Sequence, residues 1–144
     1  MPVTYVIDTA NKLIHTTCTS PLTYPEVINH FRELQRDSAC AGYLDILLDV
    51  TTADAVPDAK QLGSVTVELG AIRDKVRFGI CAIAASRDAM FGMMRMFEVY
   101  ATRYFTAVRV FRALPEAEAW LAEQKFATPP AADPGNLTPL VALS

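Results

Sequence analysis

Apolar and polar residues recur with two different periods along the chain, and segments with one period alternate with segments with the other. Strict alternation indicates strands, whereas apolar residues three and four positions apart indicate amphipathic helices. The alternation predicts strands over residues 3–8, 12–19 and 106–111, and mostly apolar runs of strand length predict buried strands over residues 43–50 and 76–84. The helical spacing predicts helices over residues 25–37, 57–75, 86–102 and from residue 115 onward. The predicted order of elements is therefore ββαβαβαβα.

This order predicts an α/β fold with one mixed sheet. A short polar turn at Thr9, Ala10 and Asn11 joins the first two strands, as in an antiparallel hairpin. The later strands are separated by helices, which implies parallel neighbours linked by right-handed crossovers. We expect the four helices mainly on one face of the sheet. Residues 1–126 form the predicted domain, and the proline-rich residues 127–144 form a tail that we expect to dock.

Composition narrows the class of protein. The 144 residues are 51% hydrophobic and 20% charged, which suits one folded domain and excludes disorder. The longest uncharged stretch, residues 13–25, contains Pro21 and is too short to span a membrane. The first residues do not resemble a secretory signal, and the three cysteines show no C-x-x-C pair, so we expect a cytoplasmic protein with reduced thiols. A pI near 5.3 argues against nucleic-acid binding.

Four segments carry a resemblance to a known family. They are LLDV at 47–50, FGMMRMFE at 91–98, VFRAL at 110–114 and AEAWL at 117–121. Together with the element order over residues 4–126, they resemble the SpoIIAA-like group of STAS domains, the sulphate-transporter and anti-sigma-factor-antagonist domains, whose fold is also similar to CRAL-TRIO lipid-binding domains. The resemblance implies a non-enzymatic STAS-like domain that binds a partner protein or a small hydrophobic or nucleotide ligand.

One position departs from that family. In the anti-sigma-factor antagonists, a serine near the start of the helix after the central strand is phosphorylated by a partner kinase. The matching position here is Ala59, which follows Asp58 at the acidic position. Alanine has no hydroxyl group, and Ser64 lies more than one helical turn away. We therefore expect no phosphorylation switch at this position.

One sequence pattern suggests catalysis. Cys81 and Arg87 have the C-x5-R spacing of cysteine-dependent phosphatases, which use a low-pKa thiolate within a phosphate-binding loop. The five residues between them are mostly apolar and contain no glycine, and burial raises the pKa of a thiol. We predict that Cys81 packs in the core and that the protein is not an enzyme, with a phosphatase-like hydrolase as a remote alternative.

Other polar residues give weaker signals. His15 and Cys18 are three positions apart on a strand, so they face opposite sides and do not suggest a metal site. We interpret His15 and His30 as ordinary strand and helix-edge residues. Asp45 lies within an apolar strand, where a carboxylate needs a partner or an exposed position. We favour an exposed edge for Asp45.

The helix over residues 86–102 is the most informative segment. Between residues 89 and 101 only Arg95 and Glu98 are charged, so apolar side chains extend beyond one core-facing stripe. Methionine-rich surfaces are adaptable and recur at binding sites. The helix is either buried by its own domain and tail, or it lines a ligand pocket, a dimer interface or a membrane-contacting surface. The predicted core face consists of Met90, Met93 or Met94, Phe97 and Ala101.

The helix over residues 57–75 has a smooth face of small residues at Ala59, Gly63, Thr66 and Gly70. If the two helices are neighbours, the gap between them becomes a plausible apolar pocket for a small hydrophobic molecule or lipid; a tight helix contact explains the same pattern. The predicted ligand-binding residues are Gly63, Val67, Gly70, Met90, Met93, Met94 and Phe97. The predicted partner or membrane surface comprises Phe91, Arg95, Met96 and Tyr100. We expect no metal or other cofactor.

Charge is segregated along the chain. Residues 73–112 hold eight basic and three acidic side chains, whereas residues 37–68 hold six acidic side chains and one basic. Such segregation is compatible with an acidic partner, with peripheral contact to anionic lipid, or with a head-to-tail match between two copies. A solvated surface is the simple alternative. The candidate partners are therefore a hydrophobic small molecule or lipid, a regulatory protein, and a second copy in a homodimer.

Overall fold

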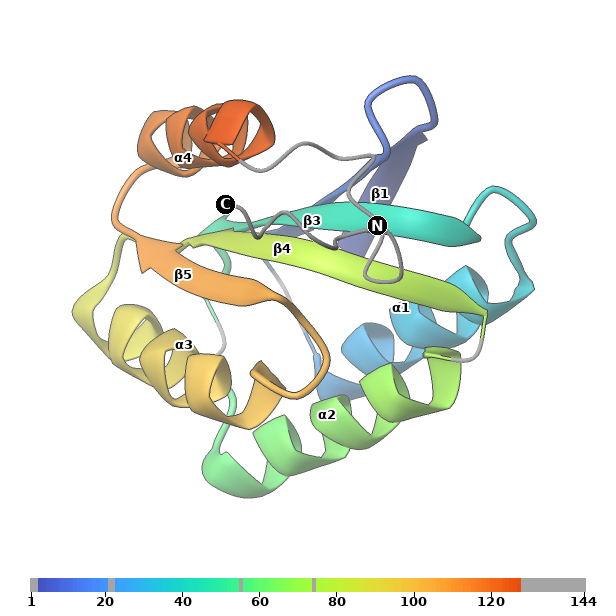
Figure 1. The fold of residues 1–144 in the computed structure, drawn as a ribbon. Coiled ribbons are helices and arrows are strands. Elements are labelled where there is room, and N and C mark those ends of the chain that lie inside the picture. The colour runs from blue at the N-terminus through green and yellow to red at the C-terminus, as the bar shows by residue number, and fades with distance from the viewer. Residues whose placement is uncertain (1–2, 21–22, 55, 74, 128–144) are drawn as a thin grey trace.

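The computed structural model describes residues 3–20, 23–54, 56–73 and 75–127, and arranges them in three layers (Figure 1). A central sheet has three helices on one face and one helix on the other. The strands are β1 (Val3–Asp8), β2 (Leu13–Thr19), β3 (Gly42–Thr52), β4 (Val76–Ala84) and β5 (Ala107–Phe111). The helices are α1 (Tyr24–Arg36), α2 (Ala59–Ile72), α3 (Asp88–Ala101) and α4 (Leu114–Ala127). The predicted docked tail lies outside the described residues.

The strands lie in the sheet in their sequence order, β1-β2-β3-β4-β5. β1 is antiparallel to β2, and each later neighbouring pair is parallel. Every crossover after β2 therefore moves one strand in the same direction, and right-handed crossovers then place α1, α2 and α3 on one face. α4 follows the last strand and covers the opposite face (Figure 1). The predicted α/β fold and element order are confirmed.

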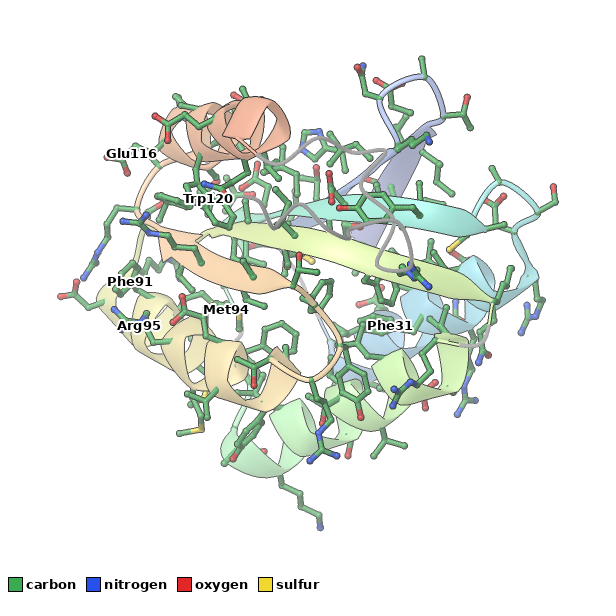
Figure 2. The ribbon with its side chains drawn as sticks, viewed as in Figure 1. Phe31, Phe91, Met94, Arg95, Glu116 and Trp120 are labelled. Atoms are coloured by element: carbon green, nitrogen blue, oxygen red, sulfur yellow. The ribbon has the colours of Figure 1, made fainter. Side chains whose placement is uncertain are left out.

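Alternating side chains of the strands supply two separate cores. On the α1–α3 face, Ile14 and Ile83 are fully buried together with α3 residue Met90. On the α4 face, the small residues Ala82 and Ala84 allow α4 to approach closely. Figure 2 shows Trp120 between α4 and the sheet, where its ring lies 5.7 Å from that of Phe111. The predicted core position of Cys81 is confirmed, since only 2% of it is exposed.

Asp45 occupies a site that its sequence context did not predict. It is 3% exposed, and its Oδ1 accepts a hydrogen bond from the Ile80 amide at 2.9 Å. The register between β3 and β4 shifts here, because Leu44 pairs with Phe78 whereas Ile46 pairs with Cys81. The shift leaves an amide of β4 without a strand partner, and the carboxylate replaces that partner. The expectation of an exposed edge for Asp45 is therefore wrong.

Gly79 makes this arrangement possible. A Cβ atom at Gly79 would lie 2.0 Å from the Tyr43 hydroxyl oxygen and 2.2 Å from Asp45 Oδ1. Burial, which has the larger effect, and the carboxylate of Asp45 raise the pKa of Tyr43 to about 12. Two polar side chains of β3 thus cross the backbone of β4 where only glycine leaves room.

The helix termini are held by specific polar contacts. Lys75, at the start of β4, donates from Nζ to the carbonyl oxygens of Leu34 at 2.9 Å and Asp37 at 2.8 Å, and also to that of Gln35. A cation at the carboxyl end of α1 satisfies free carbonyl groups and complements the helix dipole. This contact ties the end of α1 to the edge of the sheet where the parallel strands begin.

The start of α3 differs from the sequence expectation. The helix predicted over residues 86–102 begins two residues later, at Asp88, and Arg87 precedes it without a side-chain capping bond. The Ser86 carbonyl instead accepts a hydrogen bond from Arg112 at 3.2 Å, and the same guanidinium nitrogen lies 2.6 Å from Asp88 Oδ1. Arg112 therefore holds the connection between β4 and α3 in an extended conformation for one more residue.

Gly79→Ala should destabilise the fold by about 2–4 kcal/mol, because the new methyl group overlaps Tyr43 and displaces the carboxylate that accepts from Ile80. Urea unfolding of the purified variant measures this change. Gly63→Ala is the matched control, because no atom lies within 4 Å of the added Cβ in α2. We expect that control to stabilise the fold by up to about 1 kcal/mol. Equal stability of the two variants would contradict this account of Gly79.

Candidate ligand-binding cavity

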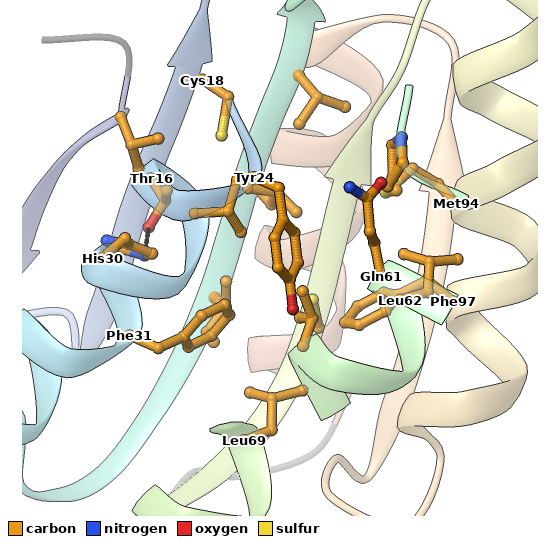
Figure 3. Close-up of a pocket in the computed structure, with 18 of the residues that line it drawn as sticks. Thr16, Cys18, Tyr24, His30, Phe31, Gln61, Leu62, Leu69, Met94 and Phe97 are labelled. Atoms are coloured by element: carbon orange, nitrogen blue, oxygen red, sulfur yellow. Dashed lines mark hydrogen bonds between the residues drawn. The ribbon is translucent and has the colours of Figure 1, made fainter. Parts of the chain in front are cut away.

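A cavity of about 290 Å³ lies between the α1–α3 helix layer and the sheet (Figure 3). Its floor is formed by β2, β3 and β4 through side chains such as Ile14, Ile46 and Cys81. Figure 2 shows Phe31 of α1 and Met94 of α3 in the space between the helices and the sheet. All three helices therefore contribute to one shared space.

Each helix supplies a different part of the wall. α2 contributes Leu62, Val65 and Leu69, which recur at helical spacing and are all buried. α3 contributes its core-facing side chains, and α1 contributes a broad set that includes polar groups. The α1 side chains at the cavity are Tyr24, Val27, His30, Phe31 and Leu34. The wall is thus mainly aliphatic and aromatic, as is typical of ligand cavities.

One end of the cavity lies where the parallel strands end. Thr23, before α1, and the segment Val56-Pro57, before α2, line this end, and both Thr23 and Val56 are exposed. Ligands of α/β sheets generally bind at this carboxyl edge of the strands. We therefore take this end as the mouth of the cavity.

The starts of α1 and α2 flank the mouth, and each is capped by its own side chains. Glu26 Oε1 accepts hydrogen bonds from the Thr23 amide at 3.0 Å and from the Thr23 hydroxyl at 2.8 Å. Asp58 Oδ1 accepts from the Gln61 amide at 2.8 Å, while Gln61 Oε1 accepts from the Asp58 amide at 3.0 Å. Both helices thus begin with a carboxylate in or next to the first turn.

His30 is a buried polar group in the wall, not the helix-edge residue that the sequence suggested. It is 7% exposed, and its Nε2 lies 3.3 Å from the hydroxyl oxygen of Thr16 (Figure 3). Its ring packs against those of Tyr5 and Phe31. Its Nδ1 has no hydrogen-bond partner among the described residues. Burial lowers the pKa of His30 to about 4, so the imidazole is neutral at physiological pH.

Tyr24 places a second polar group inside the cavity. Figure 3 shows its ring projecting from the start of α1 into the cavity, with the hydroxyl oxygen at the far end. Within the described part of the chain, no hydrogen bond or other polar interaction joins this hydroxyl to a partner. The Tyr24 hydroxyl is therefore available as both donor and acceptor.

The two thiols in the wall are unsuited to nucleophilic chemistry. Burial, with the nearby charge of Asp49, raises the pKa of Cys18 to about 12. Burial also raises the pKa of Cys81, with smaller contributions from Asp45 and Glu98. Arg87 is exposed at the end of the β4–α3 connection, whereas Cys81 lies within the floor. A thiol that is held protonated is a weak nucleophile.

Some of the predicted ligand-binding residues line the cavity, and others do not. Met90, Met94 and Phe97 line it, whereas Met93 is half-buried and packs against the surrounding core. The small-residue face of α2 points elsewhere. Gly63 lines a separate shallow groove of about 420 Å³ with Val99 and Tyr100.

The remaining two predicted α2 residues also lie away from the cavity. A Cβ at Gly70 would be 3.2 Å from the hydroxyl of Tyr104, and Val67 is 69% exposed. The expected gap between small residues of α2 and the Met and Phe side chains of α3 is therefore not where the cavity of about 290 Å³ forms. That cavity uses the opposite, aliphatic face of α2.

The predicted partner surface lies on the outer side of α3. Phe91 is half-buried beneath the guanidinium group of Arg112, 4.0 Å from the ring centre. Arg95 pairs with Glu98 at 2.9 Å, as its spacing indicates. Met96 and Tyr100 are each 38% exposed. This side of α3 is therefore partly apolar and open to solvent.

Sequence reasoning did not find the α1 wall. The signal that was available is the segment Thr23-Tyr24-Pro25-Glu26, in which Thr and Glu three positions apart predict a helix start. Such a cap fixes the direction of Tyr24, and the apolar stripe of α1 then includes His30 and Phe31 on the same side.

Comparison of the chain with protein-family models, with curated proteins and with solved structures gave no match. Among the described residues, no helix has the length and apolar character needed to cross a membrane. The same part of the chain holds no group of three or more His, Cys, Asp or Glu side chains placed to bind a metal ion.

Acidification should destabilise the fold through His30. The unfolded state takes up a proton near pH 6.5, whereas the folded state does so only near pH 4, so stability is complete above pH 6.5 and falls as the pH drops toward 4. Between pH 7 and pH 5 we expect His30 to account for a loss of about 2 kcal/mol. Urea unfolding at both pH values, compared with His30→Phe, measures this loss. An equal pH dependence in the variant would refute the assignment.

Proposed function

We propose that the chain is a non-catalytic, STAS-like binding module that holds an apolar small molecule or lipid in the cavity between α1, α2, α3 and the sheet. The observation that carries this proposal is the cavity of about 290 Å³ with its almost entirely apolar wall. The three buried free thiols favour a reducing compartment, and we propose that the protein acts in the cytoplasm.

The size of the cavity favours a cavity filled by a ligand over one that is left empty. Unfilled volume costs about 24 cal/mol per Å³, so 290 Å³ corresponds to at most about 7 kcal/mol. This is comparable to the whole stability of a small domain, about 5–15 kcal/mol. Water is a poor filling, because a buried water molecule needs two to four polar partners and the wall offers few. An apolar ligand would offset much of the cost.

The volume also limits the size of the ligand. An apolar cavity of about 150 Å³ holds one benzene ring, so about 290 Å³ has room for roughly twelve carbon atoms. A two-ring compound or a chain of about ten carbons fits. A long lipid chain would have to extend through the mouth near Val56.

A cavity-filling substitution tests this proposal. Val65→Phe adds a ring on the cavity side of α2, where Val65 is 8% exposed. We expect it to weaken binding of the neutral fluorescent probe Nile red at least about tenfold, a change of about 1.4 kcal/mol. Val67→Phe is the matched control, because it makes the same change two residues away at a 69% exposed site.

Native mass spectrometry of the freshly purified wild-type protein provides an independent measurement. We expect an added mass that disappears after organic extraction and that Val65→Phe lacks. If the wild-type chain neither carries such a mass nor binds the probe, the proposal fails. If Val65→Phe and Val67→Phe bind the probe equally well, the ligand does not occupy this cavity.

A second candidate function is that of a homodimeric regulator resembling the anti-sigma-factor antagonists. The observation that favours it is a group of exposed apolar side chains on neighbouring helices: Val67 of α2 and Val99 of α3, 69% and 70% exposed, together with Met96 and Tyr100. Exposed apolar side chains that gather on one surface typically mark an interaction site. In this alternative the partner is a second copy of the chain.

Light scattering after gel filtration tests the dimer. We expect the wild-type chain to elute as a dimer and Val99→Glu as a monomer, because the new charge would be buried at the interface. Val6→Glu, at a 68% exposed valine on β1, is the control and should remain a dimer. A wild-type monomer at high protein concentration would rule out this function.

A further inference from the structure

The position of Tyr24 within the cavity is set by the start of α1. Tyr24 is the first residue of the helix, between Thr23, which Glu26 holds by two hydrogen bonds, and Pro25, whose ring restricts the backbone. The Tyr24 side chain projects from this fixed point into the cavity (Figure 3). Its hydroxyl group is therefore held at a defined place in an apolar space.

Among the described lining residues, this hydroxyl is a polar group that a ligand could reach without breaking an existing bond, whereas the unpartnered Nδ1 of His30 is fully buried. Thr16 and His30 are engaged with each other at 3.3 Å, and the side-chain oxygen of Gln61 is engaged at the cap of α2. In the described part of the chain, Tyr24 has no such partner. A polar group in apolar surroundings gains free energy when a ligand supplies its hydrogen bond.

The surroundings of the cavity disfavour an anionic ligand. Its described lining residues include no lysine or arginine, and His30 is neutral. Glu26 and Asp58 stand at the starts of α1 and α2 on either side of the mouth. The charge of Asp49 acts on Cys18 in the wall. A carboxylate would therefore meet negative charge and no counter-ion, which makes its burial costly.

We propose that the ligand is an electrically neutral molecule with an apolar body and one hydroxyl or carbonyl group, which forms a hydrogen bond with the hydroxyl of Tyr24. This inference rests on the proposed function, because it takes the cavity to be a binding site. It specifies the class of ligand as an alcohol, ketone or aldehyde of roughly ten carbons. A free fatty acid, which is ionised at neutral pH, should bind more weakly than a neutral ligand of the same length.

Three ligands of equal chain length test the head group. Decane, 1-decanol and decanoate are each titrated against the full chain at pH 7.5 by displacement of Nile red. We expect 1-decanol to bind about three- to tenfold more tightly than decane, as one hydrogen bond predicts. Decanoate should bind at least about tenfold more weakly than 1-decanol, because its charge would be buried without a partner.

Substitution of the tyrosine identifies the partner of the head group. Tyr24→Phe keeps the ring and removes the hydroxyl, so it should lower the affinity for 1-decanol about three- to tenfold and leave decane unchanged. Tyr100→Phe is the matched control, because Tyr100 lies outside the cavity on α3 and should change neither affinity. Circular dichroism of both variants checks that the fold is retained.

The possible outcomes separate this inference from the proposed function. If none of the three ligands displaces the probe, the proposed function itself fails. If all bind, but decanoate binds best or Tyr24→Phe lowers decane and 1-decanol binding alike, the cavity is a binding site and the inference is wrong. A loss confined to 1-decanol in Tyr24→Phe supports both.

Discussion

The structure depends on one constraint, which is that every crossover from β2 to β5 advances the sheet by one strand in the same direction. Right-handed crossovers then force α1, α2 and α3 to lie side by side on one face. Neighbouring helix axes are about 8–10 Å apart, whereas neighbouring strands are only about 4.8 Å apart. Three helices therefore form a layer wider than the strands they connect, and side chains must fill the difference. The cavity lies in the part of this layer that the side chains leave unfilled.

The two ends of this layer are held differently. At the edge where the parallel strands begin, Lys75 joins the last carbonyl groups of α1 to the start of β4, and Leu34 beside it is fully buried. At the opposite edge, Thr23 with Glu26, and Asp58 with Gln61, satisfy the helix starts locally, with hydrogen bonds that do not cross from one helix to the other. The helix layer is thus fastened across elements at the edge where the parallel strands begin, and its helices are capped separately at the mouth. Under the proposed function, a ligand would enter at the end where the helix starts are capped locally.

Much of the fold was predictable from the sequence, because each element has a clear period and the turns lie between them. The face of α3 was predictable too, since Met90, Met94 and Phe97 recur at helical spacing. Asp45 was not, because a register shift between β3 and β4 leaves no mark on the periodicity of either strand. The cavity wall on α1 was not predictable either, because an apolar stripe has the same sequence pattern whether it packs against side chains or lines a void. The void depends on distances between three helices, and no single segment encodes them.

The apolar and the polar side chains of the cavity wall have different effects on ligand binding. Aliphatic and aromatic side chains provide affinity in proportion to buried area but discriminate weakly between apolar ligands of similar size. Under the proposed function, discrimination must come from the few polar groups, of which Thr16 and His30 are engaged with each other, whereas the Tyr24 hydroxyl has no partner among the described residues. Tyr24 is positioned by the start of α1, and its ring packs against the core on the same face of the sheet. Under the proposed function, a change at Tyr24 would therefore alter the selectivity of the cavity, while the sheet and helices that create the cavity remain the same.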